Sequence, residues 1–257
     1  MLTSGIKHWG LSGCSSNLPR RKFGATGQES SPQSPTISYR HPLAVSVNKR
    51  HRKIMRILIK RTTENDFPKT ENITRESFWN LYKPGCNEHL VLHNIRKSKS
   101  YIGELDFVAV FGNEIVGHII STKAKIIDSQ NNEYEILCVG PLSVSSVFRK
   151  RGIGSELLNE SIKVAKKLDY KGMILFGNPD YYHRFGYRNA QEYSITTKDG
   201  LNFEPFMALE LQTNGLANMK GKFFEDNAFV TQPNELIEFE KRFPYKEKLV
   251  TDTQLKH

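Results

Sequence analysis

A glycine loop with basic residues in front of it is the part of this 257-residue chain best suited to chemistry. Arg149, Lys150 and Arg151 precede a Gly-Ile-Gly run at residues 152–154. Glycine lets the backbone approach a ligand closely because it has no Cβ. The first turn of a helix offers unpaired N–H groups at the positive end of the helix dipole. If a helix starts here, these residue types predict a binding site for a phosphate or diphosphate.

A strand before the loop and a helix after it would position these groups. Residues 136–144 are an apolar, β-branched run of strand length. After the loop, apolar residues recur at helical spacing: Ile153, Leu157, Leu158, Ile162, Ala165 and Leu168. Neither common nucleotide motif fits, since no G-x-x-x-x-G-K-[ST] run follows a strand and Leu157 replaces the third glycine of G-x-G-x-x-G.

Two motifs in this order carry a family resemblance. Arg149-x-x-Gly152-x-Gly154 resembles the [QR]-x-x-G-x-[GA] loop with which the GNAT superfamily of N-acetyltransferases binds the pyrophosphate of coenzyme A. Downstream, Tyr182-x-x-x-Gly186-Tyr187 follows a buried strand at 172–177 and resembles the family's Y-x-x-x-G-[FY] signature. The resemblance covers roughly residues 56–211. It implies an α/β (α+β) protein with the GNAT fold, in which helices flank a central mixed, mostly antiparallel sheet of about six or seven strands.

Hydrophobic patterning gives the same order of elements. Before the loop we expect a strand at 56–60, helices at 67–82 and 86–97, and strands at 105–111, 115–122 (extended by 124–127) and 136–144. After it we expect a helix at 153–168, the strand at 172–177, a short helix, and strands at 193–197 and 206–211. We therefore divide the chain into a disordered basic extension (1–54), a GNAT acetyltransferase domain (55–211) and a C-terminal extension (212–257). The last should pack on the domain and contain a helix from Pro233.

The net charge of +10 belongs to the first part of the chain. Residues 1–54 hold nine Lys/Arg and one acid, a net charge of +8, whereas the rest holds 28 bases and 26 acids, a net charge of +2. The domain itself therefore gives no indication of a nucleic-acid partner. Three interpretations of residues 1–54 stay open: an extension before a start at Met55, an organellar targeting peptide, or a nucleic-acid-binding arm built on residues 49–53.

The cysteines and the hydropathy of the chain indicate in which cellular compartment the protein works. Cys14, Cys86 and Cys138 make no disulfide framework, which indicates a reducing environment. No apolar run reaches the length of a membrane span, so we expect no membrane partner. The predicted location is cytoplasmic, or organellar if residues 1–54 are a targeting peptide. The predicted assembly is a monomer or a homodimer.

The resemblance also implies where acetyl-CoA, the expected cosubstrate, would bind. It would insert where the strand ending at Val144 splays from the strand ending near Gly177. The cofactor-binding residues would be Leu142, Ser143, Val144, Arg149, Lys150, Arg151, Gly152, Ile153, Gly154, Ser155, Asn178 and Tyr182. The Val144 N–H would stabilise the thioester oxygen, and Tyr182 would protonate the departing thiolate, with Tyr181 as the alternative. Asn178 lies only four residues before Tyr182, closer than in many family members, so its role stays open.

The sequence constrains the general base and the acceptor substrate less than it constrains the cofactor site. We predict Glu135 as the general base, while Glu104, Asp106, His89, His93 and water remain alternatives. The candidate substrate-pocket residues are Glu88, His89, His93 and Asp106. Cys86-x-x-His89-x-x-x-His93 has ligand-like spacing but no evident fourth ligand, so we predict no metal. The predicted acceptor is a small-molecule amine. A protein or peptide acceptor, and a non-catalytic acyl-CoA-binding module, are the alternatives.

Overall fold

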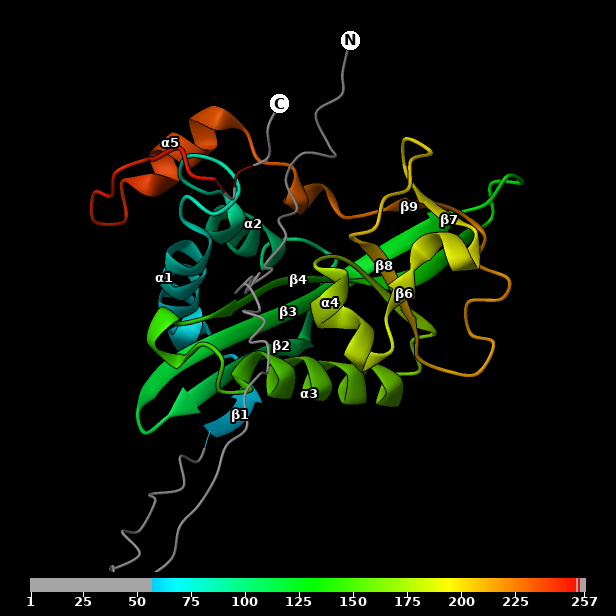
Figure 1. The fold of residues 1–257 in the computed structure, drawn as a ribbon, viewed down its shortest axis with the longest axis horizontal. Helices are drawn as coiled ribbons and strands as arrows, with labels where there is room; N and C mark the ends of the chain where they lie inside the picture. The colour runs from blue at the N-terminus through cyan, green and yellow to red at the C-terminus, as the bar shows by residue number, and fades with distance from the viewer. Residues whose placement is uncertain (1–56, 253, 255–257) are drawn as a thin grey trace, which may run out of the picture. The chain divides into compact units, whose positions relative to one another are not determined.

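A mixed sheet with helices packed on it forms the framework of the computed structural model, which describes residues 57–252 and 254 (Figure 1). The predictions for residues 1–54 and for a start at Met55 lie outside the described residues. The strands are β1 (Ile57–Arg61), β2 (Tyr101–Phe111), β3 (Glu114–Ile127), β4 (Glu133–Val144), β5 (Gly172–Phe176), β6 (Arg188–Asn189), β7 (Ile195–Thr197), β8 (Phe206–Glu210) and β9 (Gly221–Phe224). The α-helices are α1 (Phe67–Phe78), α2 (Glu88–Ile95), α3 (Ile153–Lys167), α4 (Pro179–Tyr182) and α5 (Pro233–Glu240).

The sheet is mostly antiparallel, as predicted. Its order is β1-β2-β3-β4-β5-β8-β6, and β9 pairs with both β3 and β7. The pairs β4–β5 and β7–β9 are parallel. The described residues contain nine strands rather than the six or seven expected. The two that were not predicted, β6 and β9, have two and four residues, which is too short to show alternation. Residues 221–224, expected only to dock on the domain, instead pair with β3.

The first helix begins where predicted and ends earlier. Thr63 and Asp66 form a capping box in the turn before α1, because the Asp66 carboxylate accepts from both the backbone N–H and the hydroxyl of Thr63. The prediction that the helix continues to Tyr82 is wrong. Trp79 has a ψ of 124° and Asn80 a left-handed φ of 59°, so the helical hydrogen-bond pattern stops at Phe78.

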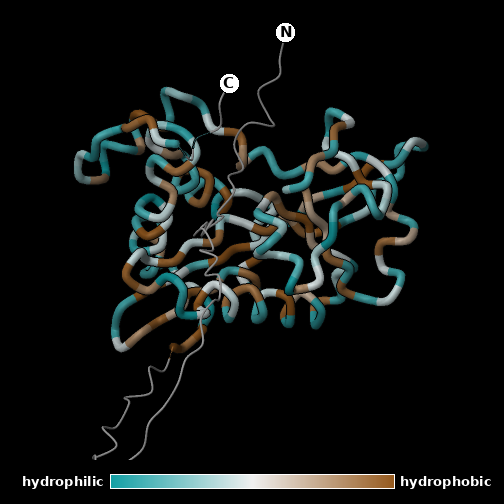
Figure 2. Tube along the Cα trace, in the orientation of Figure 1, coloured by the Kyte–Doolittle hydropathy of each residue, from teal (hydrophilic) through white to brown (hydrophobic). Residues whose placement is uncertain are grey.

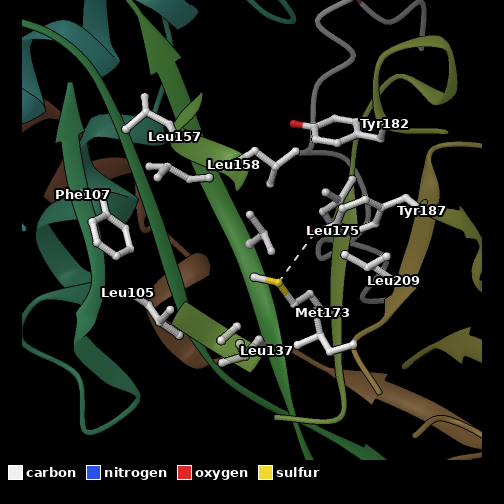
Figure 3. Close-up of a cluster of buried hydrophobic side chains, with 14 of the residues drawn as sticks. Leu105, Phe107, Leu137, Leu157, Leu158, Met173, Leu175, Tyr182, Tyr187 and Leu209 are labelled. Carbon is white, nitrogen blue, oxygen red and sulfur yellow. Dashed lines mark hydrogen bonds between the residues drawn. The ribbon is translucent and has the colours of Figure 1, made fainter. Parts of the chain in front are cut away.

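The two faces of the sheet bury separate apolar clusters. On one face, Leu157 and Leu158 of α3 pack with residues such as Leu137 of β4 (Figure 3). On the other face, Leu92 of α2 packs with residues such as Ile136 of β4. Adjacent residues of β4 thus point to opposite faces, as the two-residue period of a strand requires. Figure 2 shows hydrophobic and hydrophilic residues alternating along α3, in agreement with the predicted amphipathic helix.

The C-terminal segment contacts α1 and the loop after it. The Arg75 Nη2 atom lies 2.8 Å from Glu240 Oε2, and the Trp79 indole donates to the Glu247 carbonyl at 2.8 Å. Asn80 accepts from the Leu249 N–H at 3.1 Å. These bonds connect residues more than 160 positions apart, so they hold the C-terminal segment against the α1–α2 region.

Candidate active site

The predicted phosphate-binding loop forms a tight turn into helix α3. Gly152 is the N-cap of α3 with a φ of +85°, a left-handed conformation that favours glycine. Lys150 is also left-handed, with a φ of 60°. A methyl group at Gly154 would lie 2.8 Å from the Tyr181 hydroxyl oxygen, so a glycine is needed for this close approach. The N–H groups of Ile153, Gly154 and Ser155 lie in the first turn, where an α-helix provides no partner.

The end of β4 presents backbone groups on the side away from β3. Ser145 donates its N–H to the Val116 carbonyl at 2.9 Å, which makes this pair a hydrogen-bonded pair of the antiparallel ladder. Because such pairs alternate, Ser143 bonds to His118, its partner in register. The N–H and C=O groups of Leu142 and Val144 therefore point to the opposite side, toward β5.

Strand β5 does not reach these groups. The register between β4 and β5 contains only Leu137–Met173 and Cys138–Ile174, so the described strands are unpaired with each other beyond Cys138. The Val144 carbonyl accepts from the Ser77 hydroxyl at 3.1 Å and from Arg149 Nε at 3.4 Å. The Val144 N–H and both Leu142 groups can then bind an extended ligand in the way that a neighbouring strand would.

The two adjacent tyrosines of α4 point to different places. Tyr182 is 7% exposed and packs edge-on against Tyr187, with ring centroids 5.6 Å apart. Figure 3 shows Tyr182 at the edge of the α3-side core, near Leu158. Burial, and then the neighbouring Tyr181, raise the pKa of Tyr182 well above its usual value, so the phenol keeps its proton. Tyr181 instead places its hydroxyl against Gly154 at the start of α3.

The other predicted cofactor residues have varied contacts. Arg149 turns toward α1, because its Nη2 donates to the Ser77 carbonyl at 3.1 Å. The Arg151 guanidinium carbon lies 5.4 Å from the centre of the Phe148 ring. The Ser143 hydroxyl lies 2.9 Å from that of Thr74. Asn178 caps α4, since its side-chain oxygen accepts from the Asp180 N–H at 3.0 Å.

The structure does not bring Glu135 to the reacting end of β4. Glu135 lies nine residues from Val144 along the strand, which is roughly 30 Å of extended chain. Its exposed carboxylate pairs with Lys123 at 3.1 Å. The prediction that Glu135 acts as base on an amine held at Val144 is therefore wrong, because the two groups sit near opposite ends of one strand.

Asp106 was predicted to line the substrate pocket, but it is fully buried in an ion cluster. Its oxygens lie 3.1 Å from Arg96 Nε and 2.9 Å from His118 Nε2. Burial by itself raises the pKa of Asp106, but the charges and hydrogen bonds of His118 and Arg96 outweigh it and hold that pKa well below its usual range. Because Asp106 is fully buried and both of its oxygens bind side chains of the fold, the substrate-pocket prediction is corrected to a structural ion pair with Arg96.

The three remaining pocket candidates, all on α2, contact other protein groups; Glu88 and His89 are buried and His93 is half-buried. Glu88 is 8% exposed, and its Oε2 accepts from the Asn87 N–H at 3.0 Å. The His89 ring is fully buried with Nε2 2.6 Å from Glu240, and His93 Nδ1 lies 2.8 Å from Glu71. The paired atoms of these residues are thus occupied by protein groups, and the rings of His89 and His93 both pack against Phe239.

A scan against protein-family models identifies the domain. Residues 68–187 match the model of the acetyltransferase (GNAT) family. The matched segment, a little under half of the chain, is a GNAT acetyltransferase domain. This match contains the splayed end of β4, the 149–154 loop, helix α3 and the two α4 tyrosines, so the geometry above is that of a GNAT domain.

Known proteins share this GNAT fold at low sequence identity. The chain is 22% identical over 82 residues to the uncharacterized N-acetyltransferase YhbS of Escherichia coli K12; the match covers 32% of this chain and 47% of that protein. The aligned segment thus spans about half the length of that curated relative. The crystal structure of E. coli YhbS in complex with CoA has a TM-score of 0.61 at 21% identity, and the match covers 68% of this chain and 92% of YhbS. A GNAT acetyltransferase of Brucella melitensis in complex with acetyl-CoA has a TM-score of 0.57 at 21% identity, covering 68% and 99% of the two chains.

Sequence reasoning missed several charged residues around the GNAT site. Arg184 donates to the Ser155 hydroxyl at the start of α3 over 3.4 Å, although the two lie 29 positions apart. Glu240 comes from beyond the family match to pair with Arg75 and His89. No local pattern indicates these pairs. Over the part of the chain that the structure describes, no group of three or more His, Cys, Asp or Glu side chains could hold a metal ion, and no helix is long and apolar enough to cross a membrane.

Proposed function

We propose that this protein transfers an acetyl group from acetyl-CoA to an amine. The observation that carries this proposal is the unpaired edge of β4 at Leu142 and Val144, which leads to the 149–154 loop and the first turn of α3. An extended chain that ends in a diphosphate fits this arrangement. Hydrogen-bonding groups along β4 would bind the pantetheine arm, and free N–H groups of α3 would bind the diphosphate. The GNAT structures of similar fold that contain CoA or acetyl-CoA support the proposal.

The transfer would be direct. The Val144 N–H would donate to the thioester oxygen and stabilise the negative charge that develops there. A neutral amine nitrogen would form the new C–N bond while the C–S bond breaks, and the electron pair of that bond would leave on sulfur. Tyr182 would donate its proton to the departing thiolate. We assign removal of the acceptor's proton to water, because none of the predicted carboxylates lies at Val144.

We propose a small-molecule amine as the acceptor, with a protein or peptide amine as the alternative. The helices expected to cover the acceptor side, α1 and α2, carry ion pairs with buried side chains. The cysteine pattern supports a reducing compartment such as the cytoplasm. We also propose that the protein is a monomer or a homodimer. The proposed limits of the domain lie near residues 55 and 211.

Cofactor binding and turnover test the proposed function separately. Acetyl-CoA should raise the unfolding temperature of the wild-type protein, since a ligand that binds only the folded state stabilises it. A panel of small amines and of peptides with free amino termini would then be assayed for released CoA thiol. Failure of acetyl-CoA to bind would refute the proposal, whereas binding without turnover on any acceptor would favour the non-catalytic module.

Substitution of the tyrosines tests the acid. Tyr182→Phe should lower turnover by about 100-fold and leave the dissociation constant of acetyl-CoA nearly unchanged. Tyr181→Phe is the discriminating variant, and Tyr187→Phe is a control that removes a buried hydroxyl lying 3.9 Å from the Met173 sulfur. Loss of turnover in Tyr181→Phe but not in Tyr182→Phe would move the acid role to Tyr181.

A further inference from the structure

Two hydroxyl side chains of helix α1 reach the end of strand β4. The Thr74 hydroxyl lies 2.9 Å from that of Ser143, and both side chains are buried. Three positions later, and so on the same face of the helix, Ser77 donates its hydroxyl to the Val144 carbonyl at 3.1 Å. Two consecutive residues of β4 are therefore hydrogen-bonded to one face of α1.

Ser77, Val144 and Arg149 form a closed ring of hydrogen bonds. Arg149 donates from Nη2 to the Ser77 carbonyl at 3.1 Å and from Nε to the Val144 carbonyl at 3.4 Å. The Ser77 hydroxyl completes the ring at the Val144 carbonyl. A carbonyl oxygen has two lone pairs, so protein groups occupy both acceptor positions of Val144. The Val144 carbonyl is thus fixed from two directions, while its N–H remains on the side that β5 does not reach.

The end of β4 depends on this support because one of its sides has no strand partner. Beyond Cys138, β3 pairs with β4 but the described β5 does not. Helix α1 can provide the support because the C-terminal segment fixes its other face. Arg75 pairs with Glu240 of α5, and Trp79, directly after α1, donates its indole N–H to the Glu247 carbonyl. The C-terminal segment thus supports α1, and α1 supports the end of β4.

We propose that Ser77 is a positioning residue for acetyl transfer. It fixes the Val144 carbonyl and with it the orientation of the strand end, so that the Val144 N–H stays directed at the thioester oxygen. This assignment rests on the proposed function, because the Val144 N–H can act on a thioester only if acetyl-CoA binds along β4. Ser77 acts through Val144 and takes no part in the proton transfers.

Calorimetry with acetyl-CoA and with CoA tests this role, because CoA is a free thiol that lacks the thioester oxygen. Ser77→Ala should weaken acetyl-CoA binding about 3- to 10-fold, as expected for one impaired hydrogen bond, and leave CoA binding within about twofold of wild type. Ser77→Thr keeps the hydroxyl and should restore acetyl-CoA binding. The matched control is Ser161→Ala, since the Ser161 hydroxyl on α3 lies 3.2 Å from that of Ser121 on β3. This variant also loses a helix-to-strand contact, but it should bind both ligands like the wild type.

The thioester carbonyl provides a second readout that needs no acceptor amine. Infrared difference spectra of bound acetyl-CoA, isotope-labelled at this carbonyl, should show a lower stretching frequency in the wild type than in solution. In Ser77→Ala the frequency should lie closer to that of free acetyl-CoA. Equal weakening of acetyl-CoA and CoA in Ser77→Ala, or the same carbonyl frequency in variant and wild type, would overturn the assignment. Failure of the wild type to bind acetyl-CoA would instead refute the proposed function, and the assignment with it.

Discussion

The ion pair between Glu240 and the α1–α2 region offers a sharp test of how the C-terminal segment is held. Glu240 lies on α5, and its side chain is 17% exposed. Both Arg75 Nε and Nη2 donate to it, and His89 Nε2 lies 2.6 Å away. Glu240→Gln keeps the shape but removes the charge. Arg75, which is 3% exposed, would then lack its counter-charge, and the fully buried His89 would lose its carboxylate partner.

The size of the loss follows from the pKa of Glu240. Burial by itself raises that pKa, but hydrogen bonds from His89 and Arg75, together with their charges, outweigh burial and lower it to about 2 from the usual 4.5 of a glutamate. At 1.36 kcal/mol per pKa unit, the interactions stabilise the folded state by roughly 3 kcal/mol. Because the folded pKa is depressed, this stabilisation is present above about pH 4.5 and is lost as the pH falls toward 2.

Urea unfolding followed by circular dichroism measures this loss. The free energy of unfolding of Glu240→Gln should fall by roughly 3 kcal/mol at pH 7, and the difference from wild type should shrink between pH 4.5 and 2.5. The control is Glu238→Gln on the same helix, where both partners, Glu238 and Lys241, are more than 60% exposed; it should cost less than about 0.5 kcal/mol. If Glu240→Gln unfolds like Glu238→Gln, or if its deficit is the same at pH 7 and 2.5, the reasoning is wrong.

Two further substitutions test the packing beneath the site. Gly177→Ala adds a methyl group that collides with the Tyr182 ring, so it should destabilise the fold by about 1–3 kcal/mol and lower turnover. The control is Gly103→Ala, where the nearest atom to the added methyl group is 3.8 Å away. Equal thermal unfolding of the two variants would contradict the predicted collision. Asp106→Asn leaves Arg96 buried without its counter-charge and should lower the free energy of urea unfolding by about 3–5 kcal/mol, whereas a loss below about 1 kcal/mol would mean that water reaches this cluster.

Local sequence determined the elements that build the candidate site. The continuous apolar run of β4, the glycine at position 152 and the apolar stripe of α3 each depend on neighbours a few positions away, so their pattern could be recognised without a structure. The same holds for the capping box at Thr63. The predicted helix ends were less accurate. Helix α1 ends at Phe78 because Asn80 adopts a left-handed conformation, which helix propensity alone does not predict.

Only the tertiary structure decided which side chains meet. Asp106 and Glu135 both looked like free carboxylates in the sequence, yet Asp106 is buried between Arg96 and His118 and Glu135 lies at the far end of β4. Arg184 reaches Ser155 because α4 folds back beside α3, and Glu240 reaches Arg75 because α5 returns over α1. Such pairs depend on how strands and helices pack across tens to more than a hundred residues. Local residue patterns do not indicate which distant side chains will pair, because the hydrophobic burial that drives the packing is non-directional.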